Sequence, residues 1–342
     1  MKIDYQWFLN MEPMKYYSPA TLEKPKAQDM LANKDGGYVA MEKRDGEWCM
    51  AIIDDCGNVY LRSRSKGVSG EYGNKTAYCP HICGEISRLF PKETVLLGEL
   101  CFKDKTTTAK DVGTILRCKP EKAVQRQKED KNKLLHFNIF DCLAWDGEEI
   151  WLKSFKERFA DRHQILEDAC NCAATITVAQ IYNENFLSLY QEIISAGGEG
   201  IVIMDTNSTY AHGRRPAWSS LKVKKAVDQV EVVVIDTIEP NELYNGDCPE
   251  TWPFTKTDEQ GNTWLVTKPY YYGWKNGIVI DYKGIKTEIT SGLTDEYREW
   301  LASDAVQQAI KDGRVCAIIA AMEILPSGVF RHAILKELVV KK

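Results

Sequence analysis

The chain has 342 residues, of which 44% are hydrophobic and 27% are charged, and this length allows about two domains with ample cores. No apolar run is long enough for a membrane span or a signal peptide, and eleven cysteines without a framework spacing indicate reduced thiols, so we expect a cytoplasmic monomer with no membrane partner. The net charge of −5 does not exclude a nucleic-acid partner, because residues 1–227 hold 32 Lys and Arg against 31 Asp and Glu, whereas residues 228–342 hold 12 against 18.

The first two thirds of the chain alternate between strand patterns and amphipathic helix patterns. Runs of β-branched and aromatic residues bounded by Gly, Asn or Asp predict strands, and apolar residues at helical spacing predict helices. Gly197 suits the end of the last of these helices. The predicted strands are 38–43, 47–54, 59–65, 94–102, 134–145, 199–205 and 218–225, and the predicted helices are 80–90, 154–171 and 185–197.

The pattern changes near residues 226–228, which we interpret as the boundary between two domains, 1–227 and 228–342. Beyond it the chain is rich in strands, with one helix pattern over 295–313. Short strands of this kind are compatible with a small β-barrel such as the OB-fold. Residues 240–275 are rich in Pro, Asn, Gly, Trp and Tyr, and they predict an insertion or a long loop.

Lys43 stands at the end of a predicted strand and is followed by Arg44, Asp45 and Gly46. This pattern places an amine beside a carboxylate and a tight turn. A lysine acts as a nucleophile only after it loses a proton, which desolvation and neighbouring cations favour. The pattern alone occurs by chance in many proteins, and taken by itself it is better explained by a surface lysine beside a turn. A similar run at 34–37 lacks the spacer residue and lies in a predicted loop, so Lys43 is the better candidate.

An ordered series of residues follows Lys43, each at or near the end of a predicted strand. Taken singly these residues indicate little, because an apolar ring is more often core and a strand-end charge is more often solvated. Their joint order and spacing carry the argument. The series comprises Arg62-Ser63-Arg64, Glu99, Phe137 to Asp141, Glu199-Gly200, Tyr210, Gly213 to Arg215, and the alternating pair Lys222 and Lys224.

This series resembles the motifs of the covalent nucleotidyltransferase superfamily, which comprises ATP-dependent DNA ligases, RNA ligases and mRNA-capping guanylyltransferases. The resemblance spans about residues 24–227 in motif order. It implies an α+β fold, in which a nucleotidyltransferase (adenylation) domain of antiparallel sheets flanked by helices precedes an OB-fold β-barrel domain. It also implies ATP as the AMP donor and Mg²⁺ as a cofactor.

The resemblance implies a catalytic group of lysines and carboxylates. Lys43 would attack the α-phosphate of ATP, and Lys222 and Lys224, which share one face of a strand, would bind that phosphate. Glu199 would hold Mg²⁺, a cation that prefers oxygen ligands, and Glu99 is the second candidate metal ligand.

Further residues would bind the nucleotide according to the same resemblance. Arg64 and Glu99 would contact the ribose hydroxyl groups, and Glu42 belongs to the same nucleotide site. Phe140 would stack on adenine, with Phe137 as the weaker candidate.

Several segments are similar to DNA ligases in particular. Residues 137–159 follow the DNA-ligase pattern of a strand ending in Phe-Asp, a Gly turn and a helix with Glu-Arg, and the segments around 291–296 and 328–332 resemble the OB domains of small bacteriophage DNA ligases. We therefore expect an enzyme that seals 5′-phosphate/3′-hydroxyl nicks in duplex DNA through a lysyl-AMP intermediate, in the host-cell cytoplasm if its source is a bacteriophage. Phosphate contacts position a duplex without reading its sequence. The candidate DNA-binding residues are Arg62, Arg214, Ser291 and Arg331.

Two alternatives stay open. An RNA ligase or a capping-type guanylyltransferase shares the core motifs. An inactive nucleic-acid-binding module would use the aromatic residues of 252–274 as stacking platforms. One departure from the superfamily pattern is Trp48, which stands where an arginine is usual, so the phosphate contact of that arginine needs a replacement such as Arg44 or Arg62.

Overall fold

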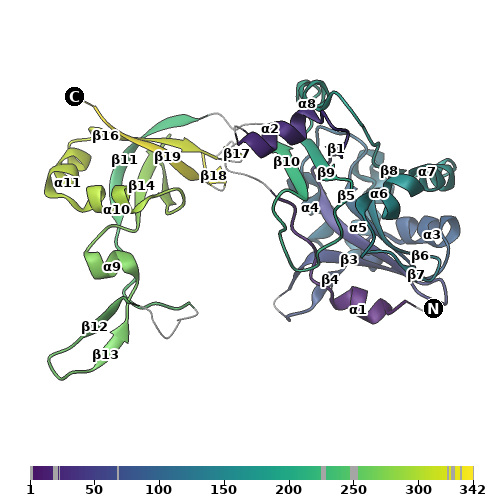
Figure 1. Cartoon of the computed structure of the whole chain (residues 1–342), viewed down its shortest axis with the longest axis horizontal. Coiled ribbons are helices and arrows are strands. Elements are labelled where there is room, and N and C mark those ends of the chain that lie inside the picture. The colour runs from purple at the N-terminus through teal and green to yellow at the C-terminus, as the bar shows by residue number, and fades with distance from the viewer. Residues whose placement is uncertain are drawn as a thin grey trace. The chain divides into compact units, whose positions relative to one another are not determined.

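The computed structural model describes residues 3–17, 22, 24–67, 69–224, 229–246, 253–321, 323–324, 328–331 and 333–341. The chain divides into two compact units, Met1–Lys225 (unit 1) and Ala226–Lys342 (unit 2) (Figure 1). The domain boundary expected after residue 227 lies outside the described residues. Within the described ranges, no helix combines the length and the apolar character that crossing a membrane requires.

A seven-stranded sheet forms the centre of unit 1. Its strands follow the order β4-β3-β2-β5-β6-β7 with antiparallel pairing, and β8 joins β6 in parallel. Alternate side chains point to opposite faces of such a sheet. The strands are β2 (Glu47–Ile53), β3 (Val59–Lys66), β4 (Tyr72–Asn74), β5 (Thr94–Cys101), β6 (His136–Trp145), β7 (Glu148–Glu149) and β8 (Ile176–Val178).

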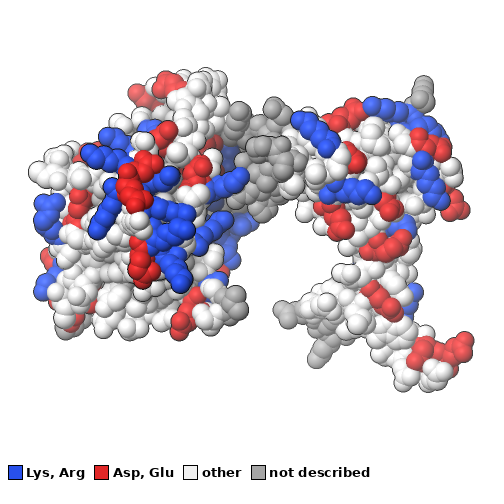
Figure 2. Space-filling model, turned by 180° about the vertical axis from the view of Figure 1, so that it is seen from behind, with Lys and Arg blue, Asp and Glu red and all other residues white. Residues whose placement is uncertain are grey.

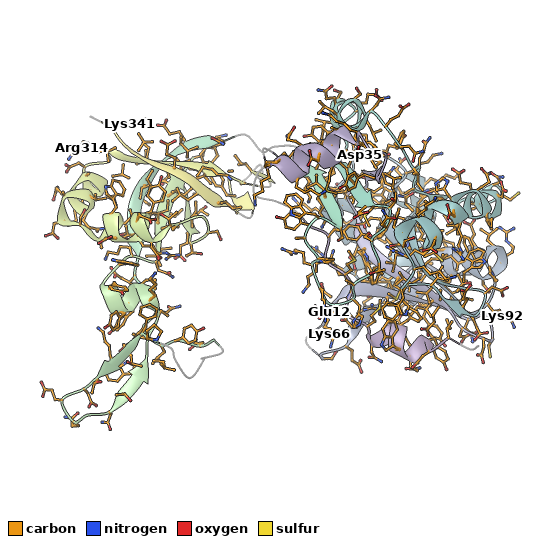
Figure 3. All side chains as sticks on the ribbon, in the orientation of Figure 1. Glu12, Asp35, Lys66, Lys92, Arg314 and Lys341 are labelled. Carbon is orange, nitrogen blue, oxygen red and sulfur yellow. The ribbon has the colours of Figure 1, made fainter. Side chains whose placement is uncertain are left out.

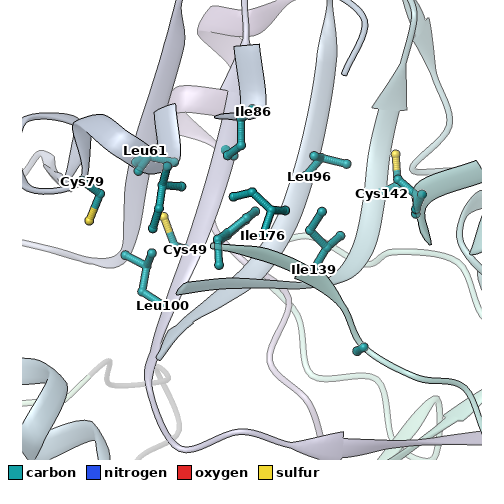
Figure 4. Packing of buried hydrophobic residues seen from close by; sticks show 14 of the residues in the cluster. Cys49, Leu61, Cys79, Ile86, Leu96, Leu100, Ile139, Cys142 and Ile176 are labelled. Carbon is teal, nitrogen blue, oxygen red and sulfur yellow. The ribbon is translucent and has the colours of Figure 1, made fainter. Parts of the chain in front are cut away.

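One face of this sheet is covered by helices. Ile86 of a covering helix belongs to the same buried cluster as Leu96, Leu100 and Ile139 of β5 and β6 (Figure 4). The helices on this face supply buried residues at helical spacing, which explains why an amphipathic sequence folds onto the sheet there. They are α3 (Pro80–Leu89), α4 (Ala109–Leu116), α5 (Pro120–Glu129) and α7 (His163–Cys170), with the short turns η1 (Thr76–Tyr78) and η2 (Lys131–Lys133).

The opposite face has a smaller core near one end of the strands. The N-terminal segment and α1 (Tyr5–Asn10) cover Met50 and Leu97 there, and Phe8 is fully buried. The other end of the same face is left for the pocket described in the next subsection.

A second, three-stranded sheet has the antiparallel order β1-β9-β10. Its strands are β1 (Tyr38–Lys43), β9 (Gly200–Asp205) and β10 (Ser220–Lys224), and α2 (Pro25–Ala32) and α8 (Phe186–Ser195) pack on its outer face. The three strands lie far apart in the sequence, so this sheet forms only when the chain closes on itself.

The helix predicted over 154–171 is interrupted. It consists of α6 (Phe155–Arg158), the turn η3 (Ala160–Arg162) and α7, because Phe159 departs from helical geometry with φ −129° and ψ −55°. Arg158 is fully buried here and donates from both Nε and Nη2 to Asp141, each at 2.9 Å, and from Nη1 to the Ser208 carbonyl oxygen.

We expect Arg158→Met to destabilise unit 1 by about 3–5 kcal/mol, because it leaves the buried carboxylate of Asp141 without its partner. The double variant Asp141→Leu/Arg158→Met should recover much of that loss. The midpoint of urea unfolding for the two variants measures the effect. Equal midpoints for wild type and Arg158→Met would show that the pair contributes nothing.

Unit 2 has the OB-fold. Its five-stranded sheet has the order β15-β14-β11-β16-β19, with α11 packed on the sheet around Val306 and Ile310. The helix predicted over 295–313 is two helices, because Ser303 between them is extended at ψ 140°. The elements are β11 (Val230–Ile238), β14 (Gly277–Tyr282), β15 (Ile285–Ile289), α10 (Asp295–Ala302), α11 (Asp304–Lys311), β16 (Val315–Ala320), β17 (Glu323–Ile324), β18 (Phe330–Arg331) and β19 (Ile334–Val340).

Residues 240–246 and 253–275 belong to the insertion between β11 and β14, whose hairpin and short helix extend from the barrel (Figure 1). They are not a featureless loop: they contain the hairpin β12 (Thr255–Thr257) and β13 (Thr263–Leu265) and the short helix α9 (Lys268–Tyr272). Tyr272 and Trp274 stack with ring centres 4.7 Å apart. Trp252 lies outside the described residues.

Candidate active site

A pocket of about 320 Å³ in unit 1 lies between the two sheets. This volume is in the range of small-ligand sites. Most of the nucleotide-site residues expected from the sequence line it. The lining residues are Tyr16, Met41, Glu42, Lys43, Arg44, Gly46, Glu47, Trp48, Arg64, Ser65, Glu99, Asn138, Phe140, Val202 and Lys222.

In the three-stranded sheet, the strand register places Lys43 and Lys224 level with each other on the two outer strands. Lys43 of β1 and Lys224 of β10 are both paired with Gly200 of the central strand β9. Gly200 has φ +143°, and a Cβ atom there would lie 2.1 Å from the Val223 carbonyl oxygen, so only glycine fits. Lys222 precedes Lys224 by two residues on β10, so both side chains point to the same face of the sheet.

Glu199 joins the two lysines. Its Oε2 lies 2.5 Å from Lys43 Nζ and its Oε1 lies 2.7 Å from Lys224 Nζ. Burial alone would raise the pKa of Glu199, but the two ammonium groups outweigh burial and hold that pKa below its usual value. The candidate nucleophile is therefore held by an ionised carboxylate.

The loop after Lys43 is anchored to the end of β5. A Cβ atom on Gly46 would lie 2.2 Å from the Leu100 carbonyl oxygen, which explains the glycine of the K-x-D-G pattern as a close backbone approach. Arg44 Nη2 donates to the Phe102 carbonyl oxygen at 2.6 Å. Burial raises the pKa of Asp45, and the nearby Glu199 carboxylate raises it further.

Glu99 lies in a row across the large sheet, between Trp48 of β2 and Asn138 of β6. Burial raises the pKa of Glu99 to about 7; Lys43 opposes this shift and Glu199 adds to it. A carboxyl group with this pKa exists in both protonation states near neutral pH, so it is able to accept or donate a hydrogen bond to a ligand hydroxyl group.

Lys222 is held in an unfavourable electrostatic environment. Burial, together with the neighbouring cations of Lys43, Arg64 and Lys224, lowers the pKa of Lys222 to about 8 against the opposing effect of Glu199. Its ammonium group lies 5.9 Å from the centre of the Tyr16 ring. A cluster of cations with too few anions is suited to binding phosphate.

We expect Lys222→Met to raise the stability of unit 1 at pH 7 by roughly 2–3 kcal/mol while it weakens nucleotide binding. The pKa of Lys222 is about 8 in the folded protein and near 10.5 in the unfolded chain, so the folded protein binds fewer protons between these values. The cost of keeping the lysine charged is therefore complete below pH 8 and disappears as the pH rises to 10.5. Urea unfolding of both proteins at pH 7 and pH 10 measures this difference, and a variant less stable than wild type at pH 7 would contradict it.

Of the other residues predicted to bind the nucleotide, some line the pocket and one does not. Phe140 is half-buried and lines the pocket, whereas Phe137 is fully buried in the core against Gly98. Arg64 lines the pocket, and its Nη2 lies 3.4 Å from the Met14 carbonyl oxygen. Glu42 lines the mouth of the pocket and forms an ion pair with Lys105.

Arg62 does not fit its expected role as a DNA contact. Its side chain is only 2% exposed, its guanidinium carbon lies 4.0 Å from the Tyr72 ring centre and 5.5 Å from that of Trp48, and Nη2 donates to the Met11 carbonyl oxygen at 2.8 Å. β3 pairs Arg62 with Met50, which lies in the part of the sheet face that the N-terminal segment covers, so the Arg62 side chain is enclosed there. This correction removes Arg62 from the DNA-binding candidates.

The other DNA-binding candidates are distributed over both units. Arg214 is exposed on unit 1, and Ser291 is exposed on unit 2, where its carbonyl oxygen accepts from the Leu335 backbone N–H at 2.9 Å. Arg331 belongs to β18, but its side chain lies outside the described residues.

Tyr16 and Asn138 line the pocket but had no individual role in the sequence prediction. Tyr16 has a buried hydroxyl group without a hydrogen-bond partner among the described residues, and burial raises its pKa well above the usual value. Its ring meets Phe140 edge-on, with centres 6.3 Å apart. Asn138, two residues before Phe140, shares the pocket face, and strand alternation was a signal that could have identified it. Asp45, the carboxylate of the K-x-D-G pattern, also had no individual role; it does not line the pocket, but the charges of Lys43 and Glu199 act on its pKa.

The proteins that this chain resembles in sequence are DNA ligases. The family described as the ATP dependent DNA ligase domain matches residues 20–224. A DNA ligase of Archaeoglobus fulgidus is 30% identical over 167 residues, which are 47% of this chain and 28% of that protein. A DNA ligase of Nanoarchaeum equitans is 24% identical over 110 residues, which are 32% of this chain and 19% of that protein. The chain thus matches less than a third of the length of either relative.

Solved structures share the fold. A Lig E DNA ligase has a TM-score of 0.54 at 15% identity, covering 89% of this chain and 93% of its own. A protein named Pmar-Lig has a TM-score of 0.62 at 18% identity, covering 97% of this chain and 68% of its own. These likenesses support the two-part architecture of adenylation domain and OB-fold. Because the family match extends over more than half of the sequence and includes the pocket, the chain belongs to the ATP-dependent DNA ligase family.

Proposed function

We propose that this chain seals 5′-phosphate/3′-hydroxyl nicks in duplex DNA through a covalent lysyl-AMP on Lys43. The observation that carries the proposal is the Lys43–Glu199–Lys224 group at one end of a nucleotide-sized pocket with Phe140 in its lining. We further propose that it is a ligase of the small bacteriophage type, because the segments around 291–296 and 328–332 resemble the OB domains of such ligases. We also propose that the protein acts as a monomer.

Three balanced transfers make up the reaction. In the first, Lys43 Nζ releases its proton to solvent and forms a bond to the α-phosphorus of ATP as the bond to pyrophosphate breaks. In the second, a 5′-phosphate oxygen bonds to that phosphorus as the Lys43–phosphorus bond breaks, and the leaving Lys43 amine takes up a proton from solvent. In the third, the 3′-hydroxyl oxygen bonds to the 5′-phosphorus and its proton goes to solvent, as the bond from that phosphorus to the AMP oxygen breaks and AMP leaves. Lys222 and Lys224 are placed to neutralise the phosphate charge that develops.

The residues fit a divalent cation of the Mg²⁺ type. Glu199, Glu99 and Asp45 provide carboxylate oxygen atoms near Lys43, and Glu199 raises the pKa of each of the other two, as expected where carboxylates gather around a site for positive charge. Glu199 and Glu99 would hold the ion, which would supply charge neutralisation at the phosphates. Competition for Glu199 would also release Lys43 from its ion pair.

Incubation of the purified protein with α-³²P-ATP and Mg²⁺, without nucleic acid, tests the first step after denaturing electrophoresis. We expect label to remain on the protein with ATP and not with GTP, and to be discharged by nicked duplex DNA with formation of sealed product. Bound AMP is first removed with pyrophosphate, so that a preloaded enzyme does not hide labelling.

The other outcomes distinguish the alternatives. Label from GTP alone would indicate a capping-type enzyme, and discharge by nicked RNA but not by DNA would indicate an RNA ligase. Wild-type protein without label from either nucleotide would contradict the proposal and leave a nucleic-acid-binding module.

A further inference from the structure

A strongly basic segment adjoins the pocket. Residues 103–133, which run from the end of β5 through α4, α5 and η2, hold ten Lys and Arg against five Asp and Glu, although the whole chain has a net charge of −5. On the face of unit 1 seen in Figure 2, Lys and Arg side chains gather into clusters. The positive charge of this acidic protein is therefore unevenly distributed.

Helical spacing places part of this charge on one continuous stripe. Lys110, Thr114 and Arg117 are four and three residues apart in and at the end of α4, and all three are exposed. In α5, Arg126 lies one turn after Lys122, and its Nη1 donates to the Thr114 carbonyl oxygen at 2.6 Å, which joins the two helices. We call this stripe the basic ridge, and it consists of Lys110, Arg117, Lys119, Lys122 and Arg126.

The charge of the basic ridge is available to a ligand. Within the described ranges of the chain, none of its five residues takes part in an ion pair, whereas Lys105 and Lys133 of the same segment do. The acidic neighbour Asp111 is occupied by the Thr108 backbone N–H and hydroxyl group in the capping box that starts α4. Among the described residues, no ion pair therefore occupies the charged groups of the ridge.

The segment is attached directly to the catalytic loop. Arg44 donates to the Phe102 carbonyl oxygen, Lys105 forms an ion pair with Glu42, and the Ala109 backbone N–H at the first turn of α4 donates to the carboxylate of Asp45. A long polyanion that reaches Lys43 is therefore well placed to continue across this segment.

The partner that fits the ridge is a phosphate backbone rather than a protein. Among the described residues, the large exposed hydrophobic side chains all lie outside 103–133, so the segment lacks the apolar centre that protein interfaces use. Lys110 and Arg117 are seven residues apart, about 10 Å along a helix, which equals roughly three base-pair steps of duplex DNA. Lysine and arginine contacts to phosphates are indifferent to sequence, as sealing of breaks requires.

We propose that the basic ridge binds the phosphate backbone of the duplex DNA that flanks the nick. This inference rests on the proposed nick-sealing function, which it deepens by assigning a substrate-docking surface to α4 and α5. The ridge contributes to DNA binding and not to the transfer of AMP to Lys43, because no ridge residue lines the pocket.

A matched pair of triple variants tests the proposal in the full chain. The ridge variant is Lys110→Gln/Lys119→Gln/Lys122→Gln, which spares Arg126 for its bond to Thr114. The control variant, Lys34→Gln/Lys92→Gln/Lys156→Gln, removes the same charge from exposed sites on other parts of unit 1, and Lys92 is labelled in Figure 3. Two quantities are measured: lysyl-AMP formation without DNA, and the dissociation constant for nicked duplex DNA over a series of salt concentrations.

We expect the ridge variant to bind nicked duplex roughly 10-fold more weakly or worse near 0.1 M salt. The logarithm of the binding constant decreases linearly with the logarithm of the salt concentration. The magnitude of this slope should become smaller by about one for each phosphate contact removed, up to about three. Lysyl-AMP formation should stay within about two-fold of wild type, on the ground that pocket chemistry is untouched. The control variant should keep both its slope and its labelling.

Other results separate this proposal from the proposed function. A ridge variant with the same slope as the control would overturn the ridge while nick sealing by wild type still stood. Equal losses in lysyl-AMP formation and DNA binding would also overturn it, because they would indicate a damaged pocket. In another outcome, wild type forms no lysyl-AMP while the ridge variant still binds duplex DNA with a weaker dependence on salt than wild type. That result would support the ridge as a DNA-binding surface and contradict the catalytic proposal. A change seen only with duplex RNA would exclude DNA as the occupant.

Discussion

Replacement of Lys43 by alanine is expected to abolish covalent labelling by α-³²P-ATP and nick sealing, with a loss of at least roughly 10⁴-fold, because the attacking nitrogen is removed. In the folded protein, Lys43 Nζ is placed by the β1–β9 register at 2.5 Å from Glu199 and in the wall of the pocket. Denaturing electrophoresis after incubation with labelled ATP and Mg²⁺ measures the first loss, and a gel assay with nicked duplex measures the second.

Two controls accompany this variant. Lys34→Ala alters the similar Lys-Asp-Gly-Gly run, which follows α2 on the surface, and it should label as wild type does. Lys43→Ala protein given DNA that already carries AMP on its 5′-phosphate should still seal it, because that step needs no lysyl-AMP. Labelling of Lys43→Ala at the wild-type level would show that another residue is the nucleophile.

The variant Glu199→Gln is expected to slow lysyl-AMP formation by roughly 10²–10³-fold, comparable to removal of one preorganised electrostatic group in other enzymes. Glutamine keeps the shape of the side chain but loses the charge that holds Lys43 and Lys224, whose ammonium groups lie 2.5 and 2.7 Å away. It also removes a candidate Mg²⁺ ligand. The Mg²⁺ concentration that gives half the maximal labelling rate should therefore rise together with the fall in rate.

The matched control for this variant is Glu192→Gln, on the exposed side of α8 seven residues earlier. It makes the same chemical change without touching the pocket, and wild-type kinetics are expected. Thermal unfolding of both variants shows whether the fold is kept. A Glu199→Gln enzyme with unchanged rate and unchanged Mg²⁺ dependence would remove Glu199 from the catalytic group.

Most strands could be predicted from the sequence because their signals are local. The runs at 38–43, 47–54 and 59–65 appear as β1, β2 and β3 with ends that differ by one residue at most. Breaks within helices were harder to predict. The interruption after Arg158 and the one at Ser303 depend on where the chain packs, and neither position has a Gly or Pro to signal it.

The helices α4 and α5, which carry the basic ridge, also escaped prediction. Residues 120–129 are strongly polar, and only Ala123 and Gln127 of α5 are buried. A helix that buries so little of its surface has a weak amphipathic pattern, and it is held by its neighbours rather than by its own sequence. The sequence showed basic runs there but not their arrangement on one surface.

The identity and order of the candidate site residues, from Lys43 through Glu99 and Glu199 to Lys224, could be predicted from the sequence alone, because their joint order resembles the motifs of a known superfamily although each single pattern is weak. Only the tertiary structure decided which of them meet. Lys43 and Glu199 are 156 residues apart in the chain and are joined by the pairing of β1 with β9, and Arg62 is buried by the N-terminal segment, where it donates to the Met11 carbonyl oxygen 51 residues away. Burial, which raises the pKa of Glu99 and lowers that of Lys222, is likewise a property of the assembled pocket. Strand pairing and desolvation arise between distant segments, so no local pattern contains them.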